Sequence, residues 1–383
     1  MDGLELLLRL VRIPSPNPPG DTIAIADFVA DQMRAIDCDV QQPAPAQKSY
    51  ARNTIATLGR GEPRIMLHAH IDTVPIAKAE AENWSVDPYA GDVRDGALYG
   101  KGSIDDKAVL ASMMLTMMEA AQQEELAGTL ILVAAAEEET GGQLGTKWLA
   151  NDGHLPPCDF IIVGEQTGNK VATAHKGVLR ATIQTTGKSV HATNPDRGIN
   201  AIVAMSKIIS ALSAYHRDLS RLIHPVVGVP TCNVGVIAGG STANAVPDTC
   251  IIRLDRRMIP GEEPEAVVAE LRAVLDSVDL NGATVNMGDI VYSRWYESGL
   301  STGYAKTFMD CVREELNDQP GPIGYLPGSD AKHLMDLAQG DMIIFGPGSY
   351  EVAHAADEHV RLEDYETTTA ILKDFVRRTL YTD

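Results

Sequence analysis

Residues 64–72 read RIMLHAHID, an apolar run that ends in a histidine and a carboxylate two residues apart. Side chains alternate between the two faces of an extended segment, so His70 and Asp72 point to the same side. An imidazole beside a carboxylate at the end of a buried strand is a common arrangement for a metal ligand and the group that orients it. His68 shares that face and is equally eligible at this point. The stretch therefore predicts a buried strand that delivers a metal ligand at its carboxyl end.

Length and composition limit the class of protein. A chain of 383 residues is too long for one ordinary core, so two domains are expected, and 44% hydrophobic with 22% charged residues is a globular composition. The net charge of −20 argues against nucleic acid or an anionic membrane as partner. No apolar stretch approaches the roughly 20 residues of a membrane span, and the first residues do not resemble a signal peptide. We expect a cytoplasmic protein that binds neither nucleic acid nor membrane.

The cysteines are sparse and odd in number, with no CxxC spacing. This pattern disfavours a disulfide framework or a thiolate zinc site and favours buried free thiols. The five positions are Cys38, Cys158, Cys232, Cys250 and Cys311.

Strand-like and helical runs alternate up to residue 176, which predicts an α/β domain with a mostly parallel central sheet. The expected elements are helices 4–12, 22–36, 106–123 and 144–151 and strands 53–58, 64–70, 128–136 and 159–164. We interpret the methionines of the 106–123 helix as core filling, because they recur at helical spacing. They are Met113, Met114, Met117 and Met118.

The pattern changes between residues 177 and 291. Two successive βαβ-like halves follow one another there, which is the order of a ferredoxin-like α+β domain. Their elements are strand 178–186, helix 198–214, strands 231–237 and 249–257, helix 262–276 and strand 283–290. A helix at 302–316 and a strand at 342–345 then resume the first pattern. We predict a discontinuous catalytic domain, residues 1–176 and 292–383, with the domain 177–291 inserted.

Acidic side chains gather after two of the predicted strands and at the start of a helix. Asp105 follows a glycine-rich loop and could be the N-cap of the helix that begins there. The run Glu137-Glu138-Glu139 follows the apolar segment 130–136, and three adjacent carboxylates repel one another unless a cation binds them. A solvated loop is the alternative for this run. Glu165 directly follows another apolar strand.

His354 completes the set, in a Gly/Pro loop after the strand 342–345. A lone histidine is usually structural. However, functional groups of open α/β sheets collect beyond the carboxyl ends of the strands, and we expect that placement for all five clusters. The clusters are His70 with Asp72, Asp105, the run 137–139, Glu165 and His354. Histidines and carboxylates without cysteine suit two ions of zinc, cobalt or manganese. Two such ions need a bridging carboxylate, a bridging water as nucleophile and a further carboxylate as general base.

These motifs resemble, in order and almost end to end, those of the co-catalytic zinc metallohydrolases, the family of acetylornithine deacetylase, succinyl-diaminopimelate desuccinylase, aminoacylase and bacterial glutamate carboxypeptidase. The resemblance implies two divalent ions per subunit, zinc first and cobalt or manganese as alternatives. It assigns His70 and Glu165 to one ion, Glu139 and His354 to the other, and Asp105 as the bridge. It makes Glu138 the general base and Asp72 the orienting partner of His70. A cis peptide bond at Asp105–Asp106 is frequent in the family, and the sequence cannot show it.

The inserted segment resembles the family's lid and dimerisation domain. The resemblance implies a homodimer in which His191 reaches the partner's active site and stabilises the oxyanion. Asn244 and Arg257 match the residues that bind the substrate carboxylate, and Ser329 lies in a motif matching a substrate-pocket loop.

Two motifs depart from the family pattern. Residues 164–167 read Gly-Glu-Gln-Thr, so Gln166 replaces the proline of the common Gly-Glu-Pro-Thr. Residues 105–108 read Asp-Asp-Lys-Ala, so Asp106 replaces the methionine of the common Asp-Met-Lys-Gly. Neither departure removes a ligand. The chain also lacks a Cys-Thr-Glu signature of many acetylornithine deacetylases.

The activity that the resemblance implies is hydrolysis of an amide bond in a small carboxylate-bearing substrate, such as an N-acyl amino acid, by a metal-bridged hydroxide. Alternatives within the enzyme class are a dipeptidase or carboxypeptidase, or hydrolysis of another C–N bond in a carbamoyl or amine group. A catalytically inactive binding protein on the same fold is the alternative from a different class, and retention of every ligand and of the base argues against it.

Overall fold

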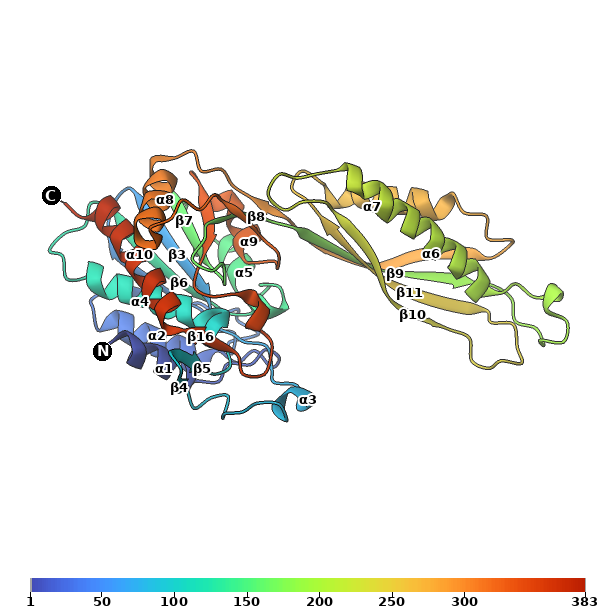
Figure 1. Cartoon of the computed structure of the whole chain (residues 1–383), viewed down its shortest axis with the longest axis horizontal. Helices are drawn as coiled ribbons and strands as arrows, with labels where there is room; N and C mark the ends of the chain where they lie inside the picture. Colours follow the sequence, from blue (N-terminus) through green and yellow to red (C-terminus); the bar gives the residue numbers. More distant parts are fainter. Residues whose placement is uncertain (1, 383) are drawn as a thin grey trace. The chain divides into compact units, whose positions relative to one another are not determined.

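The computed structural model describes residues 2–382, which form two compact units. One comprises the chain up to Thr173 together with the chain from Ser298 onwards, and the other comprises Ala174–Glu297 (Figure 1). The borders at 173/174 and 297/298 lie a few residues from the boundaries that the sequence indicated.

A largely parallel sheet forms the centre of the first unit. Its strand order is β1-β2-β6-β3-β7-β15, after which β8 begins to pair at Ala172. The four strands β6, β3, β7 and β15 run parallel, and β2 and β1 continue the sheet in antiparallel orientation. The strands are β1 (Asp39–Gln41), β2 (Thr54–Gly59), β3 (Arg64–His70), β6 (Thr129–Ala135), β7 (Phe160–Gly164), β8 (Ala172–His175) and β15 (Met342–Phe345). The parallel strands are buried along their whole length apart from Arg64, as expected for strands covered on both faces.

Helices from both ends of the chain share one hydrophobic core with this sheet. The side chain of Phe308 on α8 lies 5.0 Å from Phe345 and 5.2 Å from Phe375 between ring centroids, which joins α8, β15 and α10. The methionines of α4 are buried except Met118, which is partly buried, so their interpretation as core is confirmed. The helices are α1 (Gly3–Val11), α2 (Ile23–Arg34), α4 (Ala108–Ala120), α5 (Thr146–Asn151), α8 (Gly303–Leu316), α9 (Ala331–Leu334) and α10 (Leu362–Leu380).

Short elements complete the first unit. A small sheet has the order β16-β5-β4, and β14 pairs with β8 beside the main sheet. Their bounds are β4 (Asp92–Arg94), β5 (Ala97–Tyr99), β14 (Ile323–Tyr325) and β16 (His359–Arg361), with a short helix α3 (Lys78–Ala81).

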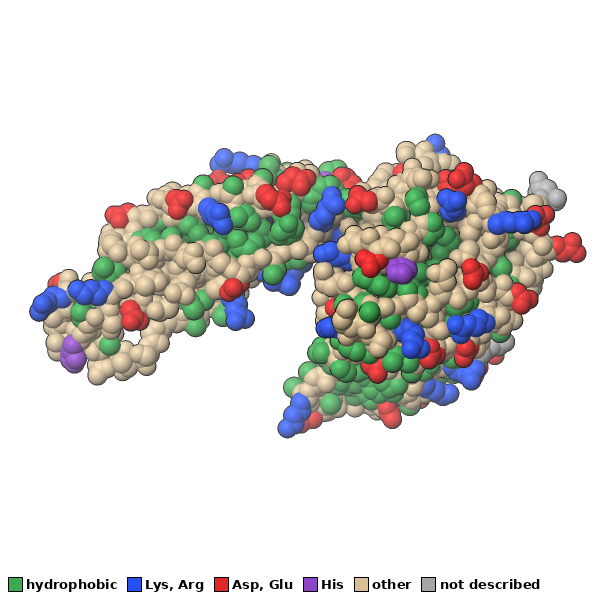
Figure 2. All heavy atoms as spheres, turned by 180° about the vertical axis from the view of Figure 1, so that it is seen from behind, with side chains coloured by type: hydrophobic (Ala, Val, Ile, Leu, Met, Phe, Trp, Pro, Cys, Tyr) green, Lys and Arg blue, Asp and Glu red, His purple; other side chains and the backbone are tan. Residues whose placement is uncertain are grey.

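The second unit is a four-stranded antiparallel sheet with two helices. Its chain order is β9, α6, β10, β11, α7, β12 and its sheet order is β10-β11-β9-β12, which is the ferredoxin-like arrangement. The bounds are β9 (Gly177–Thr186), α6 (Ala201–Asp218), β10 (Thr231–Gly239), β11 (Thr249–Met258), α7 (Pro264–Asp276), β12 (Thr284–Ser293) and β13 (Tyr296–Glu297). Hydrophobic side chains reach the surface of this unit (Figure 2). The predicted fold class, an α/β domain interrupted by an α+β domain, is confirmed.

Two smaller expectations also have an outcome. All five cysteines are buried and unpaired, as predicted. None of the helices between residues 2 and 382 combines the length and the hydrophobicity that crossing a membrane requires.

Candidate metal centre

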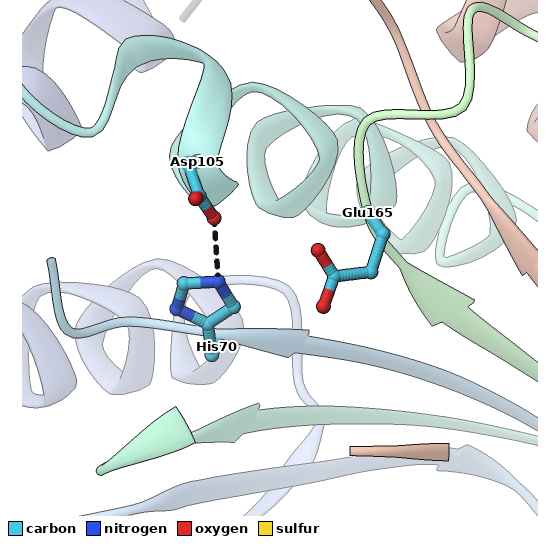
Figure 3. Close-up of side chains that lie close together, drawn as sticks. All are labelled: His70, Asp105 and Glu165. Carbon is cyan, nitrogen blue, oxygen red and sulfur yellow. Dashed lines mark hydrogen bonds and ion pairs between the residues drawn. The ribbon is translucent and has the colours of Figure 1, made fainter. Parts of the chain in front are cut away.

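The first group of candidate ligands lies where two parallel strands end. His70 is the last residue of β3, and Glu165 directly follows β7. Asp105 belongs to the short segment η1 (Ser103–Lys107) before α4, in which its own backbone is not helical. The three side chains converge, with His70 Nε2 lying 2.9 Å from Asp105 Oδ1 (Figure 3). One ligand atom from each lies within 4.8 Å of the others, and all three residues are buried. This group could hold one metal ion.

A second group shares Asp105 with the first. His354 Nε2 lies 3.0 Å from Asp105 Oδ2 and 3.2 Å from Glu139 Oε2. Since His70 approaches Oδ1 and His354 approaches Oδ2, the two carboxylate oxygens of Asp105 face different histidines. One carboxylate therefore spans both ligand groups. Asp105 is not the N-cap of α4, which was its alternative role, because α4 begins at Ala108 and the position before it is Lys107, whose side chain makes no capping hydrogen bond.

The main chain at Asp105 is held by a residue that the sequence did not single out. Glu358 Oε1 accepts hydrogen bonds from the amides of Ile104 at 3.4 Å and Asp105 at 3.3 Å, and its Oε2 lies 3.3 Å from Lys101 Nζ. Both side chains of this ion pair are buried. The peptide bond Asp105–Asp106 is cis. The only signal in the sequence was the position of Glu358, four residues after His354.

Asp72 contacts one residue of each group, His70 and Glu139. His70 Nδ1 is 3.0 Å from the main-chain oxygen of Asp72 and 3.6 Å from its carboxylate. The carboxylate accepts hydrogen bonds from the amides of Glu138 at 3.1 Å and Glu139 at 3.3 Å, and from the side chain of Asn17 at 2.9 Å. Asp72 therefore contacts the histidine chiefly through its main chain and fixes the acidic loop through its side chain.

Glu138 lies next to the second group without belonging to either. Its Oε1 is 3.7 Å from Nζ of Lys332, a buried cation on α9. Burial raises the pKa of Glu138 to about 8, against the opposing effect of Lys332. A carboxyl group with such a pKa can accept and return a proton near neutral pH.

The electrostatics of the cluster test whether divalent cations fit it. Burial raises the pKa of Glu139 and Glu165, and the neighbouring carboxylates raise them further. Burial alone would also raise the pKa of Asp105, but hydrogen bonds with His354 and His70 outweigh it and lower that pKa. The same contacts with Asp105 and Glu139 raise the pKa of His354 to about 10. Mutually repelling buried carboxylates and two imidazoles are a donor set that fits two borderline divalent cations.

A cavity of about 190 Å³ opens onto both groups. Its lining includes Glu138 and four of the candidate ligands, Asp105, Glu139, Glu165 and His354. Among the other lining residues are Gln166, Tyr325 and Tyr350, which the sequence left without a role. Gln166 had a signal, its departure from the family pattern, whereas Tyr325 had none. Ser329 is fully buried, and its hydroxyl accepts a hydrogen bond from the amide of Ala331.

His68 lies on the same strand as His70 but does not line this cavity. His68 is buried, with Nε2 2.7 Å from the hydroxyl of Thr146. In the second unit, His191 is exposed and its segment pairs with that of Asn244, since the amide of Ala192 donates to the Asn244 carbonyl at 3.0 Å.

Arg257 lies on β11 of the second unit. Its Nε donates to Asp255 at 2.8 Å, and its side chain is 37% exposed, so the guanidinium retains donors for a ligand.

Comparison with known proteins identifies the family. A model of peptidase family M20/M25/M40 matches residues 66–378. The chain belongs to this family. It is therefore an enzyme, a metal-binding hydrolase of the metallopeptidase and amidohydrolase class, as the motifs predicted.

Individual relatives within the M20 family are distant. An acetylornithine deacetylase of Proteus mirabilis is 28% identical over 97% of this chain and 95% of its own length. A tripeptidase structure from Staphylococcus aureus shares the fold with a TM-score of 0.80, at 22% identity over 98% of this chain and 97% of that one. A dinuclear metal binding peptidase from Bacillus subtilis has a TM-score of 0.71, at 18% identity over 98% and 96% of the two chains.

Proposed function

We propose that this M20 enzyme hydrolyses the amide bond of an N-acyl amino acid or a similar small carboxylate-bearing substrate. The observation that carries the proposal is the position of the Asp105 carboxylate: its Oδ1 lies 2.9 Å from His70 Nε2, and its Oδ2 lies 3.0 Å from His354 Nε2. A carboxylate in that position can bridge two ions. The similarity to an acetylornithine deacetylase supports an acyl amino acid as the substrate class.

The ligand roles follow from the two groups. His70, Asp105 and Glu165 would hold one divalent ion, and Asp105, Glu139 and His354 would hold the other, with zinc as the first candidate and cobalt or manganese as alternatives. When bound, such ions polarise the scissile carbonyl and lower the pKa of the attacking water. Asp72 orients His70 through its main-chain oxygen and fixes the main chain of Glu138 and Glu139 through its carboxylate.

Glu138 acts as the general base. It is close to both ligand groups without being part of either, and it lines the cavity. It takes a proton from the attacking water and returns it to the leaving amine. Lys332, 3.7 Å away, stabilises its charged form.

The inserted domain supplies three further roles: His191 stabilises the oxyanion in the partner's active site, and Asn244 and Arg257 bind the substrate carboxylate. Ser329, which belongs to the first unit, contributes to the substrate-pocket loop. We further propose a cytoplasmic homodimer through the inserted domain. Support comes from β10, an edge strand that exposes Val236 and Ile237.

The dimer has its own test. Ile237→Lys should shift the mass measured by light scattering from that of a dimer to that of a monomer, whereas Val93→Lys, on the first unit, should not. A wild-type protein that is monomeric at every concentration would contradict the dimer.

The substrate class is tested by a panel of N-acyl amino acids, dipeptides and N-carbamoyl amino acids with added zinc, cobalt or manganese. We expect the highest kcat/KM for an N-acyl amino acid. A preference for dipeptides or carbamoyl compounds would shift the assignment to those bonds. Absence of amide cleavage with every metal would overturn the proposal.

A further inference from the structure

Two uncharged side chains surround the carboxylate of Glu165. The hydroxyl of Tyr325 lies 2.8 Å from Glu165 Oε2 and 2.8 Å from Gln166 Oε1. The amide nitrogen of Gln166 donates to Asp105 Oδ1 at 2.8 Å and to Glu165 Oε2 at 3.3 Å. All four residues are at most 8% exposed. A closed hydrogen-bonded set therefore joins two candidate ligands of the first group.

We propose that Gln166 and Tyr325 are positioning residues, which hold Glu165 and Asp105 at the spacing that the first metal ion requires. The inference rests on the proposed ligand role of Glu165. It adds two residues that act on the metal only through other side chains.

The physical need for such a pair comes from charge. Glu165 shares a buried site with Asp105, Asp106 and Glu138, and repulsion among these carboxylates would turn Glu165 away from the group. Donors from Tyr325 and Gln166 oppose that rotation. Both bonds go to Oε2, so Oε1 keeps its lone pairs for a metal.

Tyr325 and Gln166 differ in the candidate ligands that they contact. Tyr325 contacts only Glu165 and Gln166 within the set, whereas Gln166 also contacts Asp105, the carboxylate that both groups share. Loss of the Tyr325 hydroxyl should therefore affect one metal ion. Loss of the Gln166 amide should affect both, the first more strongly.

The sequence context agrees with a dedicated role. Position 166 departs from the Gly-Glu-Pro-Thr pattern, and a proline there would have no side-chain donor. Tyr325 is supplied by β14, about 160 positions away in sequence, and its ring packs edge-on against Tyr350 at 6.4 Å between centroids.

The test measures metal affinity, not only turnover. The full-length protein is stripped with a chelator and titrated with zinc and with manganese by calorimetry. Residues that orient metal ligands typically contribute 10–100-fold to affinity. Tyr325→Phe should weaken one of two binding steps by about 10-fold or more and leave the other within about twofold.

Tyr350→Phe is the matched control, because it removes the same hydroxyl from the same cavity, and no hydrogen bond joins that hydroxyl to a ligand among the described residues. It should keep both affinities. If Tyr325→Phe folds poorly, Gln166→Leu tests the same proposal, because it removes the amide that donates to Asp105 and Glu165. Because both residues act through Glu165, the double variant should lose less affinity than the two single losses combined.

Two failures can be told apart. Affinities unchanged by Tyr325→Phe and Gln166→Leu, or weakened equally at both steps by Tyr325→Phe, would overturn the positioning role. Glu165→Gln serves as the reference: if it retains both binding steps at wild-type affinity, the ligand assignment in the proposed function fails instead.

Discussion

The two ligand groups share Asp105, but their histidines differ in burial and in the secondary structure that carries them. In the first group, His70 is 2% exposed, stands at the end of a buried parallel strand, and is held by the main chain of Asp72. In the second, His354 is 51% exposed and lies in a loop at a φ of 60°. A ligand on a rigid strand is fixed before a metal arrives, whereas a loop ligand is ordered at a cost in conformational entropy. The comparison indicates a tighter first site and a more exchangeable second one.

Asp105→Ala is the most severe test, because it removes the one residue common to both groups. We expect both metal ions to bind too weakly to survive dialysis, and turnover to fall below detection. Metal analysis by plasma mass spectrometry after dialysis checks the stoichiometry. Retention of one ion at full occupancy would show that Asp105 does not bridge.

Glu138→Gln should separate chemistry from metal binding. The amide keeps the shape of the side chain but cannot accept a proton, so kcat should fall by about 10²–10⁴-fold while both metal affinities stay near wild type. Calorimetry and steady-state kinetics on the same preparation measure the two quantities. Loss of a metal ion instead would mean that Glu138 is a ligand.

His70→Ala and His354→Ala probe the asymmetry directly. We expect His70→Ala to weaken one binding step by more than about 100-fold, beyond the range of residues that only orient ligands. His354→Ala should weaken the other step by a smaller factor, because water can replace an imidazole that is already half exposed. Competition with a chelating dye measures both. Equal losses would remove the distinction between the groups.

Much of this centre was predictable because it follows from strand geometry. The carboxyl ends of β3, β6, β7 and β15 meet at one edge, so residues following those strands had to gather there. The ferredoxin-like unit was predictable for a different reason: its long strands and helices carry clear periodicity in the sequence.

Other parts depended on tertiary placement that no local pattern encodes. Tyr325 reaches Glu165 only because β14 folds back beside β8, and Glu358 meets the Asp105 amide from the opposite end of the chain. The three-residue strands β4, β5 and β16 are too short for a period to show. The hydroxyl of Ser329, expected in a substrate pocket, is bonded to the amide of Ala331, a contact set by the start of α9.

Glu358→Gln is expected to have the smallest effect, and it reports on the residue that both groups share. The amide oxygen can still accept from Ile104 and Asp105, but the charge that pairs with Lys101 is lost. We expect about a 10-fold weakening of both binding steps, because a neutral amide oxygen accepts these hydrogen bonds more weakly than a carboxylate does and so holds the main chain of Asp105 less firmly.

The matched control is Glu80→Gln, because Glu80 also lies near Lys101 Nζ, at 3.5 Å, and makes no hydrogen bond to the amides of Ile104 or Asp105 among the described residues. It should leave both affinities unchanged. If Glu80→Gln weakens binding as much as Glu358→Gln does, the charge of the Lys101 cluster matters and the hold on the Asp105 amide does not. If Glu358→Gln weakens only one step, the main chain at Asp105 serves one group, and the two groups are less tightly joined than their common carboxylate implies.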